Sequence, residues 1–567
     1  MRILKKVGYK TYDQETTMIN FSNNNRKKMI KKFQKKELDL LIIGGGITGA
    51  GIALDAVSRG MKVGLLEKND FASGTSSKST KLIHGGLRYL KQFDFWLVRE
   101  VGMERAIIHG LAPHLVVPDK MLLPIIKEGT YGSWLTSIGL KIYDVLASVE
   151  GDDKRKMLNK QEALEKEPLL PPKILEGAGY YAEYRTDDAR LTTEVMKTAY
   201  EKGARILNYC EVSEFLYKEG KVKGVKAHDH LSDSDFEVRA RYTINATGPW
   251  VDRVRQNLNS DDLLGKRLLP TKGVHLVFPY EKFPLKQSVY FDVPDGRMIF
   301  GIPRGKITYV GTTDTKYNDD LDKVETDIAD AAYLINAVNL MFPDIELKLE
   351  DVESSWAGLR PLIYEEGKTA GELSRKDEVF ESENGLISIA GGKLTGYRKM
   401  AERVVDLVAR RFEVEEDLEF RKVQTESITL TREPFANYKA VQRYIDQVHS
   451  IMKPEGFDRA DATTLVHNFG HDAEMILDRF AELNDADKDI RLAKAELWYT
   501  VNYEMVAMAL DFFERRTGKM YFEVPAIEKI KIPILDEMAE MLDWSDSFKN
   551  EQLELVDQKL HEVRNFE

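Results

Sequence analysis

The sequence predicts a protein of the α/β plus α class: an α/β domain with an inserted antiparallel sheet, followed by an all-helical C-terminal domain. One observation behind this is an apolar run at residues 38–43 that leads into a glycine-rich turn and a helix-like segment. A second is a series of short β-branched and aromatic runs between residues 268 and 312, bounded by Pro and Gly. A third is the helical periodicity that prevails from about residue 411. Because 567 residues exceed what one core holds, two or three domains are expected.

The glycine-rich turn after residue 43 characterises the first domain. Gly44, Gly46 and Gly49 form a G-x-G-x-x-G pattern, and Glu67 ends the next apolar run, 23 positions after Gly44. In a β-α-β unit the first glycine permits a tight turn, the second lets the backbone approach a pyrophosphate, and the third lets the helix pack close to the strand. A carboxylate at the end of the second strand accepts a hydrogen bond from a ribose hydroxyl. The pattern therefore predicts a Rossmann-like dinucleotide site, because a purely structural glycine turn leaves Glu67 unexplained.

The nucleotide-binding domain is predicted to be discontinuous. Residues 177–250 and 385–410 return to the β/α pattern on either side of the strand-rich segment, which is therefore expected to be inserted. Apolar residues between Leu497 and Phe512 fall on one face of a helix, and we interpret them as domain core rather than as a partner-binding surface. The predicted divisions are 38–115, 177–250 and 351–410 for the nucleotide-binding domain, 116–176 and 251–350 for a substrate-binding domain, and 411–567 for a helical cap domain.

Residues 1–37 are predicted to be a basic leader outside these domains. The segment at residues 26–36 carries seven positive charges in eleven positions, and no apolar stretch of signal-peptide length follows it. The favoured interpretation is a solvated, partly disordered segment. The alternative is a basic amphipathic turn, with Met29, Ile30 and Phe33 on its apolar side, that rests on anionic lipid.

The overall composition excludes several classes of protein. A net charge of −11 argues against a broad nucleic-acid-binding surface. The single cysteine, Cys210, rules out an internal disulfide, fits a reducing compartment, and is expected to be a buried apolar residue. No run of 18 apolar residues occurs, so no membrane span is predicted.

Several polar segments are candidates for binding and catalysis. Small and hydroxyl residues, among them Thr75 and Ser76, follow the second strand and can wrap a phosphate. His84 and Arg88 then flank a Gly-Gly pair, which is typical of an anion-binding catalytic rim. Two later segments, LRPL at residues 359–362 and GGKLTG at residues 391–396, place a single cation in apolar or glycine-rich surroundings. Each of these is weak alone, because an isolated cation is usually solvated at the surface.

Taken in order, these segments resemble one family. The glycine pattern, SGTSSKSTKLIHGGLRYL at residues 73–90, ATGPW at 246–250, GTTD at 311–314 and GGKLTGYRKMAE at 391–402 are similar to FAD-dependent glycerol-3-phosphate dehydrogenase of the bacterial aerobic type. The resemblance covers about residues 38–530 and includes a helical cap. It implies that the first domain is an FAD-binding domain and that no metal is needed.

The resemblance also implies roles for individual residues. Arg88 with its neighbour Tyr89, Arg360 and Lys393 are similar to the substrate-binding residues of the family, and Arg304 is a further candidate. The residues implied in FAD binding are Gly44, Gly46, Thr48, Gly49, Glu67, Lys68, Thr75, Ser76, Ser77, Val212, Ala246, Thr247, Gly248, Gly392, Lys393, Leu394 and Thr395.

The implied reaction is oxidation of sn-glycerol 3-phosphate at C2, by hydride transfer to FAD, to give dihydroxyacetone phosphate in glycerol catabolism. A dianionic phosphate is costly to desolvate, so several cations are expected around it. His84 is the first choice for the base that takes the proton of the C2 hydroxyl, and His275 is the second. Lys393 is expected to stabilise negative charge on the reduced cofactor.

The expected electron acceptor is a membrane quinone, because no surplus inserted segment of the kind found in related oxidases is apparent. This implies a cytoplasmic protein that contacts the inner face of the cytoplasmic membrane peripherally; a homodimer is left open. An oxygen-using glycerol-3-phosphate oxidase is the alternative. An amine or amino-acid oxidase, an RNA-modifying flavoprotein and a non-catalytic nucleotide-binding scaffold are less favoured, since the grouped cations suit phosphate and the net charge disfavours RNA.

Overall fold

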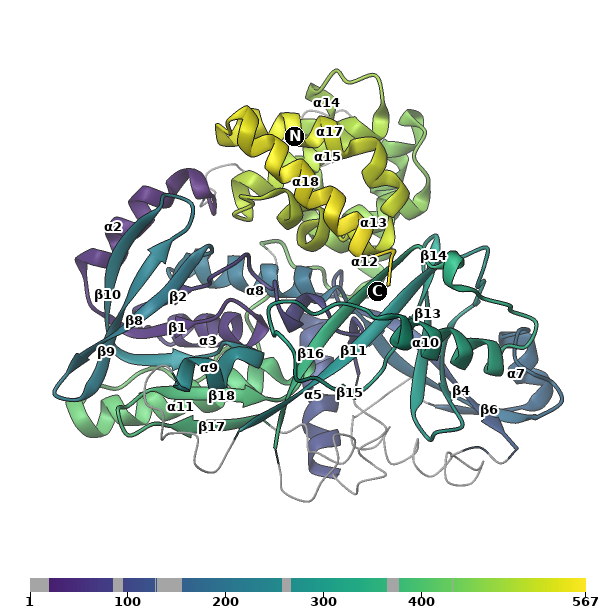
Figure 1. Cartoon of the computed structure of the whole chain (residues 1–567), viewed down its shortest axis with the longest axis horizontal. Helices are drawn as coiled ribbons and strands as arrows, with labels where there is room; N and C mark the ends of the chain where they lie inside the picture. Colours follow the sequence, from purple (N-terminus) through teal and green to yellow (C-terminus); the bar gives the residue numbers. More distant parts are fainter. Residues whose placement is uncertain are drawn as a thin grey trace.

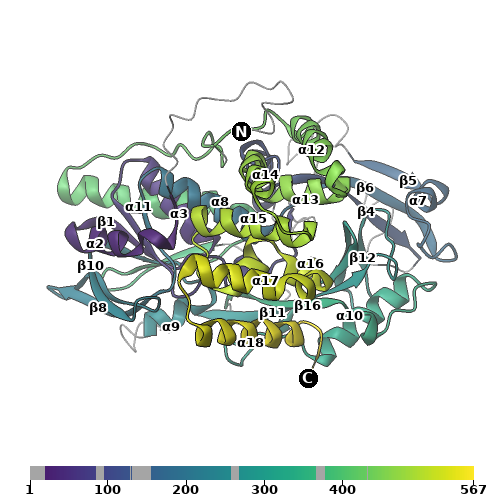
Figure 2. The same ribbon diagram turned by 90° about the horizontal axis from the view of Figure 1, so that it is seen from above.

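The computed structural model describes residues 20–84, 95–127, 129, 155–256, 267–364, 377–430 and 432–566. Two sheets lie side by side, and a group of helices from the C-terminal part of the chain covers them (Figure 1). Seen from above, these helices extend across the junction of the two sheets (Figure 2). The predicted α/β plus α class is confirmed.

The first sheet is the nucleotide-binding sheet, with the order β17-β18-β10-β1-β2-β7. Its central pairs are parallel, whereas the edge strand β17 pairs antiparallel with β18 and the hairpin strand β9 pairs antiparallel with β10. Every residue of β1 is buried, as expected for a parallel strand covered on both faces. Helix α3 lies between α8 and α11 against this sheet. The bounds are β1 (Leu38–Ile43), β2 (Val63–Leu66), β7 (Arg205–Leu207), β10 (Ser234–Asn245), β17 (Asp377–Glu381), β18 (Ile387–Gly391), α3 (Ile47–Ser58), α8 (Asp188–Glu201) and α11 (Tyr397–Glu416), and the hairpin β8 (Cys210–Lys218) and β9 (Lys221–Asp229) extends β10.

The second sheet is mostly antiparallel, with the order β15-β11-β14-β13-β12-β4-β6-β3. Strand β16 pairs with β11 along ten residues, and β4 and β12 form the one parallel pair among its described strands. One face packs against α10 and the other against the C-terminal helices. The bounds are β3 (Leu82–Ile83), β4 (Val117–Ile126), β5 (Lys156–Asn159), β6 (Leu175–Arg185), β11 (Leu268–Pro279), β12 (Ser288–Asp292), β13 (Met298–Arg304), β14 (Ile307–Gly311), β15 (Thr315–Lys316), β16 (Ser354–Ile363) and α10 (Ile328–Met341).

Strand membership departs from the predicted domain division at three places. Strands β3 and β16 and most of β6 come from segments assigned to the nucleotide-binding domain, yet all three pair within the second sheet. The reason is that β16 continues the hydrogen-bonded ladder of β11 before the chain returns to β17 and β18 of the first sheet. The segments that connect the two sheets along the chain therefore also contribute strands to the second sheet.

The C-terminal region is helical, but one predicted helix is interrupted. The helical face expected from Leu497 to Phe512 stops at Tyr503, where α15 ends, and a π-helix, η9, begins at Asp511. Tertiary ion pairing overrides local periodicity here, because the Glu504 carboxylate turns toward α8. The bounds of the remaining helices are α5 (Phe95–Leu111), α7 (Lys160–Lys166), α9 (Val251–Gln256), α12 (Tyr438–Met452), α13 (Arg459–Phe469), α14 (Ala473–Glu482), α15 (Lys488–Tyr503), η9 (Asp511–Arg516), α16 (Lys519–Phe522), α17 (Val524–Leu542) and α18 (Asp546–Glu562).

The described part of the basic segment, residues 20–37, is folded against the protein, which corrects the expectation of a solvated leader there. Residues 26–35 form helix α2 (Arg26–Lys35), and Met29 and Phe33 are buried against the first sheet. The Arg26 Nε donates a hydrogen bond to Asp229 Oδ1 at 2.8 Å. The apolar side of α2 is therefore covered by protein and not free to enter lipid, and its lysines face outward.

Three further features bear on the composition of the chain. Within the described ranges, no helix has both the length and the apolar character needed to cross a bilayer. The same ranges contain no group of His, Cys, Asp and Glu arranged to hold a metal ion. Cys210 is buried and has no disulfide partner, as predicted.

Candidate functional site

A cavity of about 540 Å³ opens at the carboxyl ends of β1, β2 and β18. Its position, where parallel strands end and helices begin, is the usual ligand site of open α/β sheets, and its volume falls in the range of cofactor pockets. We call it the cofactor cavity. The predicted cofactor residues that line it are Gly44, Gly46, Thr48, Glu67, Lys68, Thr75, Ser76, Val212, Ala246, Thr247, Gly248, Gly392, Lys393 and Leu394.

The first wall of this cavity is built from glycine backbone. Gly44 has a φ of +111°, and a Cβ there would lie 2.6 Å from the Ala246 carbonyl oxygen. A Cβ on Gly49 would lie 2.0 Å from the carbonyl oxygen of Gly44. Helix α3 begins at the next turn without a side-chain cap from Gly46. The N–H of Ile47, its first residue, donates to Ser76 Oγ at 2.9 Å at the cavity rim, and a helix start of this kind favours phosphate.

Glu67 is held rigidly at the edge of the cofactor cavity. Its Oε2 accepts a hydrogen bond from the Gly45 N–H at 2.6 Å, and its Oε1 accepts one from the Asn69 N–H at 2.8 Å. Burial raises the pKa of this carboxyl, and the two backbone hydrogen bonds oppose that rise. Each oxygen keeps a further lone pair, so the carboxylate can still accept from a ribose hydroxyl.

The second wall comes from the turn between β18 and α11. Gly391 and Gly392 have φ values of +78° and +76°, and a Cβ on Gly392 would meet the Met400 sulfur at 2.4 Å. Lys393 and Leu394 follow directly and line the cavity. The glycine backbone of this turn and one lysine therefore form the cavity wall on this side.

Three predicted cofactor residues do not line the cavity. Gly49 packs α3 against the Gly44 carbonyl, and the Ser77 hydroxyl donates to the Gly74 carbonyl oxygen at 3.4 Å. Thr395 is buried at the start of the turn into α11. These three residues support the walls of the cavity from behind.

Arg360 lies on β16 and is clamped by the loop that follows β14. Its Nη2 donates to Thr312 Oγ1 at 2.8 Å, and its Nη1 donates to the Thr313 carbonyl oxygen at 3.1 Å. The Asp314 carboxylate lies 3.3 Å from the same Nη1. A Cβ on Gly273 of β11 would lie 2.3 Å from the guanidinium, so only glycine leaves room for it. Two of the segments singled out in the sequence, GTTD and LRPL, thus meet in space.

His275 packs against the same loop from β11. Its ring stacks on Trp356 of β16 with centroids 4.7 Å apart, and its Nε2 lies 3.0 Å from Thr80 Oγ1. A Cβ on Gly311 would lie 2.0 Å from the imidazole. Burial lowers the pKa of His275 well below its usual range, and the positive charge of Arg360 adds to this, so the ring is neutral at pH 7.

The remaining predicted substrate residues are placed differently. His84 lies half-buried at the end of β3, with its ring 5.9 Å from that of Phe300. Arg304 lines another cavity, of about 630 Å³, between the second sheet and the C-terminal helices, and its substrate-binding role stays a prediction. Its guanidinium pairs with Asp187 and stacks on Phe522. Arg88 and Tyr89 lie outside the described residues.

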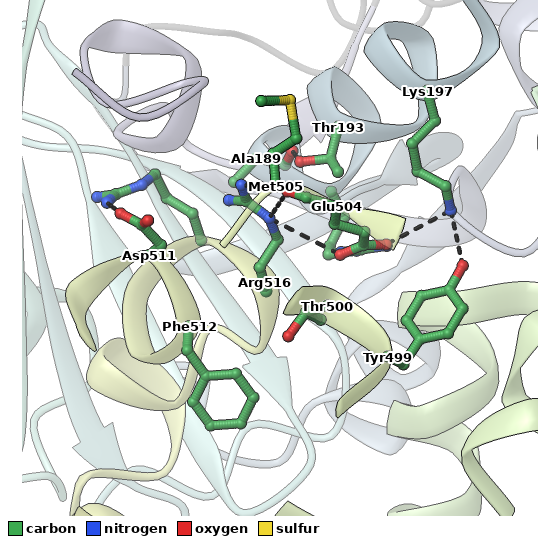
Figure 3. A network of polar contacts seen from close by, with 12 residues as sticks. Ala189, Thr193, Lys197, Tyr499, Thr500, Glu504, Met505, Asp511, Phe512 and Arg516 are labelled. Carbon is green, nitrogen blue, oxygen red and sulfur yellow. Dashed lines mark hydrogen bonds and ion pairs between the residues drawn. The ribbon is translucent and has the colours of Figure 1, made fainter. Parts of the chain in front are cut away.

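The sequence interpretation missed a buried ionic network behind the loop that follows β2. Asp70 accepts two hydrogen bonds from Arg516, each at 2.8 Å, and one from Arg515 Nε at 2.6 Å. Nearby, Arg190 of α8 donates to the Glu504 carboxylate. Lys197, further along α8, reaches the same carboxylate (Figure 3). The available signal was the pair of adjacent arginines in the FFERR segment at residues 512–516, because buried arginines demand acidic partners.

Comparisons with known proteins agree with this geometry. The model of the family described as FAD dependent oxidoreductase matches residues 39–398, and that of the C-terminal domain of alpha-glycerophosphate oxidase matches residues 430–549. The chain is 49% identical over 548 residues to the aerobic glycerol-3-phosphate dehydrogenase of Bacillus subtilis (strain 168), covering 96% of this chain and 98% of that protein. It is 47% identical, with the same coverage, to the enzyme of that name from Staphylococcus aureus (strain USA300). A solved glycerol-3-phosphate dehydrogenase from Bacillus halodurans, complexed with FAD, is similar with a TM-score of 0.81 and 42% identity, covering 96% of this chain and 99% of that one.

Proposed function

The chain belongs to the FAD-dependent glycerol-3-phosphate dehydrogenases of the bacterial aerobic type, and we propose that Arg360, Lys393 and His275 carry out its reaction and that a membrane quinone takes the electrons. The protein is an FAD-dependent oxidoreductase that oxidises glycerol 3-phosphate. The observation that supports the residue assignment best is that Arg360 and His275 meet the same loop, residues 311–314, from two neighbouring strands.

The cofactor cavity fits FAD in shape and chemistry. The glycine wall is closely packed, because a Cβ on Gly44 or Gly49 would meet backbone oxygen, and the start of α3 faces the place of the pyrophosphate. Glu67 accepts from a ribose hydroxyl, and the turn from β18 into α11 lies along the remaining part of the cavity. When bound there, FAD supplies the oxidising chemistry by accepting a hydride from C2 of the substrate.

The phosphate of the substrate is bound by cations on the second sheet and on the β18–α11 turn. The Arg360 guanidinium is already oriented by Thr312 and Thr313, so little side-chain entropy is lost when it binds an anion. A charge-assisted hydrogen bond of this kind contributes about 1.5 to 3 kcal/mol. Lys393 brings a second positive charge from the wall of the cofactor cavity.

The base is assigned to His275 rather than to His84, the first choice from the sequence. A neutral imidazole is the form that can accept the proton of the C2 hydroxyl, and burial together with Arg360 lowers the pKa of His275 so that this form prevails. Its Nδ1 makes no hydrogen bond to the described residues. We expect His275→Asn to slow cofactor reduction about 10²-fold in a single turnover. A larger effect from His84→Asn would return the role to His84.

The function as a whole is tested with the purified holoprotein under anaerobic conditions. Addition of sn-glycerol 3-phosphate should bleach the flavin absorption band, and sn-glycerol 1-phosphate should leave it unchanged. Addition of a quinone or of oxygen to the reduced enzyme then distinguishes a dehydrogenase from an oxidase by the rate at which each reoxidises the flavin. A flavin band that persists with both phosphates would contradict the proposed reaction.

The proposed acceptor also implies where the protein works. Quinones reside in the bilayer, so the enzyme must contact a membrane surface, and we infer that it does so peripherally from the cytoplasmic side. Exposed lysines of α2 give this surface a positive charge that suits anionic lipid. Co-sedimentation with vesicles of anionic and of neutral lipid would test this inference.

A further inference from the structure

The cavity of about 630 Å³ between the second sheet and the C-terminal helices is separate from the cofactor cavity, because the two share no lining residue. It is lined by the end of β6, the turn between β13 and β14, and helices α13 and α15 to α17. Arg360, Lys393 and His275, the residues proposed for the reaction, all lie outside it. Its volume suits a small molecule, and the proposed oxidation leaves it without a ligand.

We propose that this cavity, here named the anion cavity, binds inorganic phosphate or the phosphate group of a small monoester, at a site distinct from the active site. The ligand is held by Arg185, Arg304 and Arg459, and His467 donates a further hydrogen bond to it. The inference goes beyond the proposed oxidation, which needs only the phosphate site beside FAD. Its support comes from grouped positive charges, from buried donors without an acceptor, and from the pairing of the acidic residues in the cavity.

Three arginines from different elements are grouped around His467. Arg185 ends β6, Arg304 ends β13 and Arg459 begins α13. All three act on the same imidazole: burial lowers the pKa of His467 to about 3, and the positive charges of the arginines add to this shift. The imidazole is therefore neutral at pH 7, and three guanidinium groups lie within electrostatic reach of it.

Two buried nitrogen atoms in this group have no hydrogen-bond partner among the described residues. They are Nη1 of Arg304 and Nε2 of His467. Arg304 is already oriented, because its Nη2 lies 3.2 Å from Asp187 Oδ2. Arg185 Nη1 donates to the Pro303 carbonyl oxygen at 3.0 Å, which holds the second guanidinium close to the first. Buried donors without an acceptor are costly, and phosphate oxygens would satisfy them.

The acidic side chains of the anion cavity are compensated by other groups. Six acidic residues line it, and four of them form ion pairs with lysine or arginine. By contrast, Arg185 and Lys306 have no ion pair among the described residues, so the charge left for a ligand is positive. The four paired acids are Asp187 with Lys81 and Arg304, Asp489 with Lys529, and Glu496 and Glu523 with Lys519; Asp461 accepts from the Asp458 N–H, and the charge of Arg564 acts on Glu353.

The geometry favours phosphate over a carboxylate as the ligand. The donors come from two strands and one helix, so they approach from several directions, as the oxygens of a tetrahedral group require. A carboxylate is planar and offers only two oxygens, which a single guanidinium can satisfy. A cavity of about 630 Å³ also leaves room for an organic part beside the phosphate.

The test is equilibrium dialysis of radiolabelled inorganic phosphate against the oxidised, FAD-loaded enzyme. Arg360→Gln weakens the proposed phosphate contact of the active site, so phosphate that still binds to this variant reports the anion cavity. In that background, Arg185→Gln/Arg459→Gln removes two of the three guanidinium groups. The matched control is Arg239→Gln/Arg421→Gln, which removes two exposed arginines that do not line the cavity.

We expect Arg360→Gln to keep one bound phosphate per chain. Adding Arg185→Gln/Arg459→Gln should weaken this binding about tenfold or more, whereas the control pair should leave it unchanged. With Arg360 intact, the cavity variant should retain FAD and a KM for glycerol 3-phosphate within about twofold of wild type, which establishes that it folds. Equal phosphate binding in the cavity and control variants, or none once Arg360 is replaced, would overturn the anion cavity and leave the proposed oxidation intact.

Glycerol 2-phosphate separates the two sources of the phosphate group. It should displace the labelled phosphate at a lower concentration than unlabelled phosphate does if the anion cavity accepts a monoester. A higher concentration would identify free inorganic phosphate as the ligand. Loss of flavin bleaching by glycerol 3-phosphate, with phosphate still bound in the Arg360→Gln variant, would contradict the proposed oxidation and not the anion cavity.

Discussion

The cofactor cavity and the ionic network behind it are built on opposite principles, although one short loop belongs to both. The cavity is shaped by backbone, at glycines whose neighbours leave no room for a Cβ. The network is made of side chains, and its central contact joins Asp70 to Arg516, 446 positions further along the chain. Steric contact limits which residues the cofactor cavity tolerates, and the cost of burying an unpaired charge limits which residues the network tolerates. Single substitutions should therefore affect them in different ways.

The largest effect is expected at the helix glycine nearest the cavity. Gly49→Ala places a methyl group 2.0 Å from the Gly44 carbonyl oxygen, so α3 must move away from β1 and the FAD site is lost. We expect a colourless protein with activity reduced by a factor on the order of 10³ or more, measured by flavin content and turnover. Gly110→Ala, in α5 with nothing within 4 Å, is the control and should be neutral or slightly stabilising. Retained FAD in Gly49→Ala would show that the wall is not sterically limited.

The next effect concerns a buried charge. Asp70→Asn leaves Arg515 and Arg516 buried without their shared carboxylate, which should lower the free energy of unfolding by about 3 to 5 kcal/mol. Denaturant unfolding measures this. The exposed pair of Arg459 and Asp446 serves as control, because Asp446→Asn should cost less than about 1 kcal/mol. Equal losses in both variants would remove the distinction between buried and exposed pairs.

The Asp70 carboxylate should make the free energy of unfolding depend on pH in the acidic range. Burial alone would raise the pKa of Asp70, but Arg516 and Arg515 outweigh it and lower the pKa to about 2. The unfolded value is about 3.9, so Asp70 stabilises the folded state by about 2 to 3 kcal/mol above that pH, and this is lost as pH falls from about 4 toward 2. The difference in stability between wild type and Asp70→Asn should therefore shrink over this range. A constant difference would mean that the carboxyl is not paired as described.

A smaller effect, on KM, is expected at Arg360, whose guanidinium is held by hydrogen bonds to the loop after β14. Arg360→Lys keeps the charge but loses the planar contacts to Thr312 and Thr313, so KM for glycerol 3-phosphate should rise about tenfold. The rate of cofactor reduction at saturating substrate should change less. Arg443→Lys, at an exposed position on α12, is the matched control. An unchanged KM would exclude Arg360 from phosphate binding.

Much of the nucleotide-binding region could be predicted from the sequence because its rules are local. The glycines at 44, 46 and 49, the strand before them and Glu67 lie within about 30 residues, and their spacing alone identifies the β-α-β unit, although the carbonyl of Ala246 also limits the residue at position 44. The same holds for the turn at residues 391–396, whose positive φ values require its glycines. The identity of the base and the position of Arg304 depend on contacts across the fold. Nothing in a single sequence says which of two cavities an arginine faces, or how deeply a histidine is buried.

The order of the segments and their chemistry could thus be predicted from the sequence wherever backbone geometry restricts the residue type. The contacts of Asp70 with Arg516 and of Glu504 with Arg190, and the burial that keeps His275 neutral, required the folded molecule. The physical reason is that Coulomb interactions and desolvation depend on distances across the fold, which sequence separation does not encode.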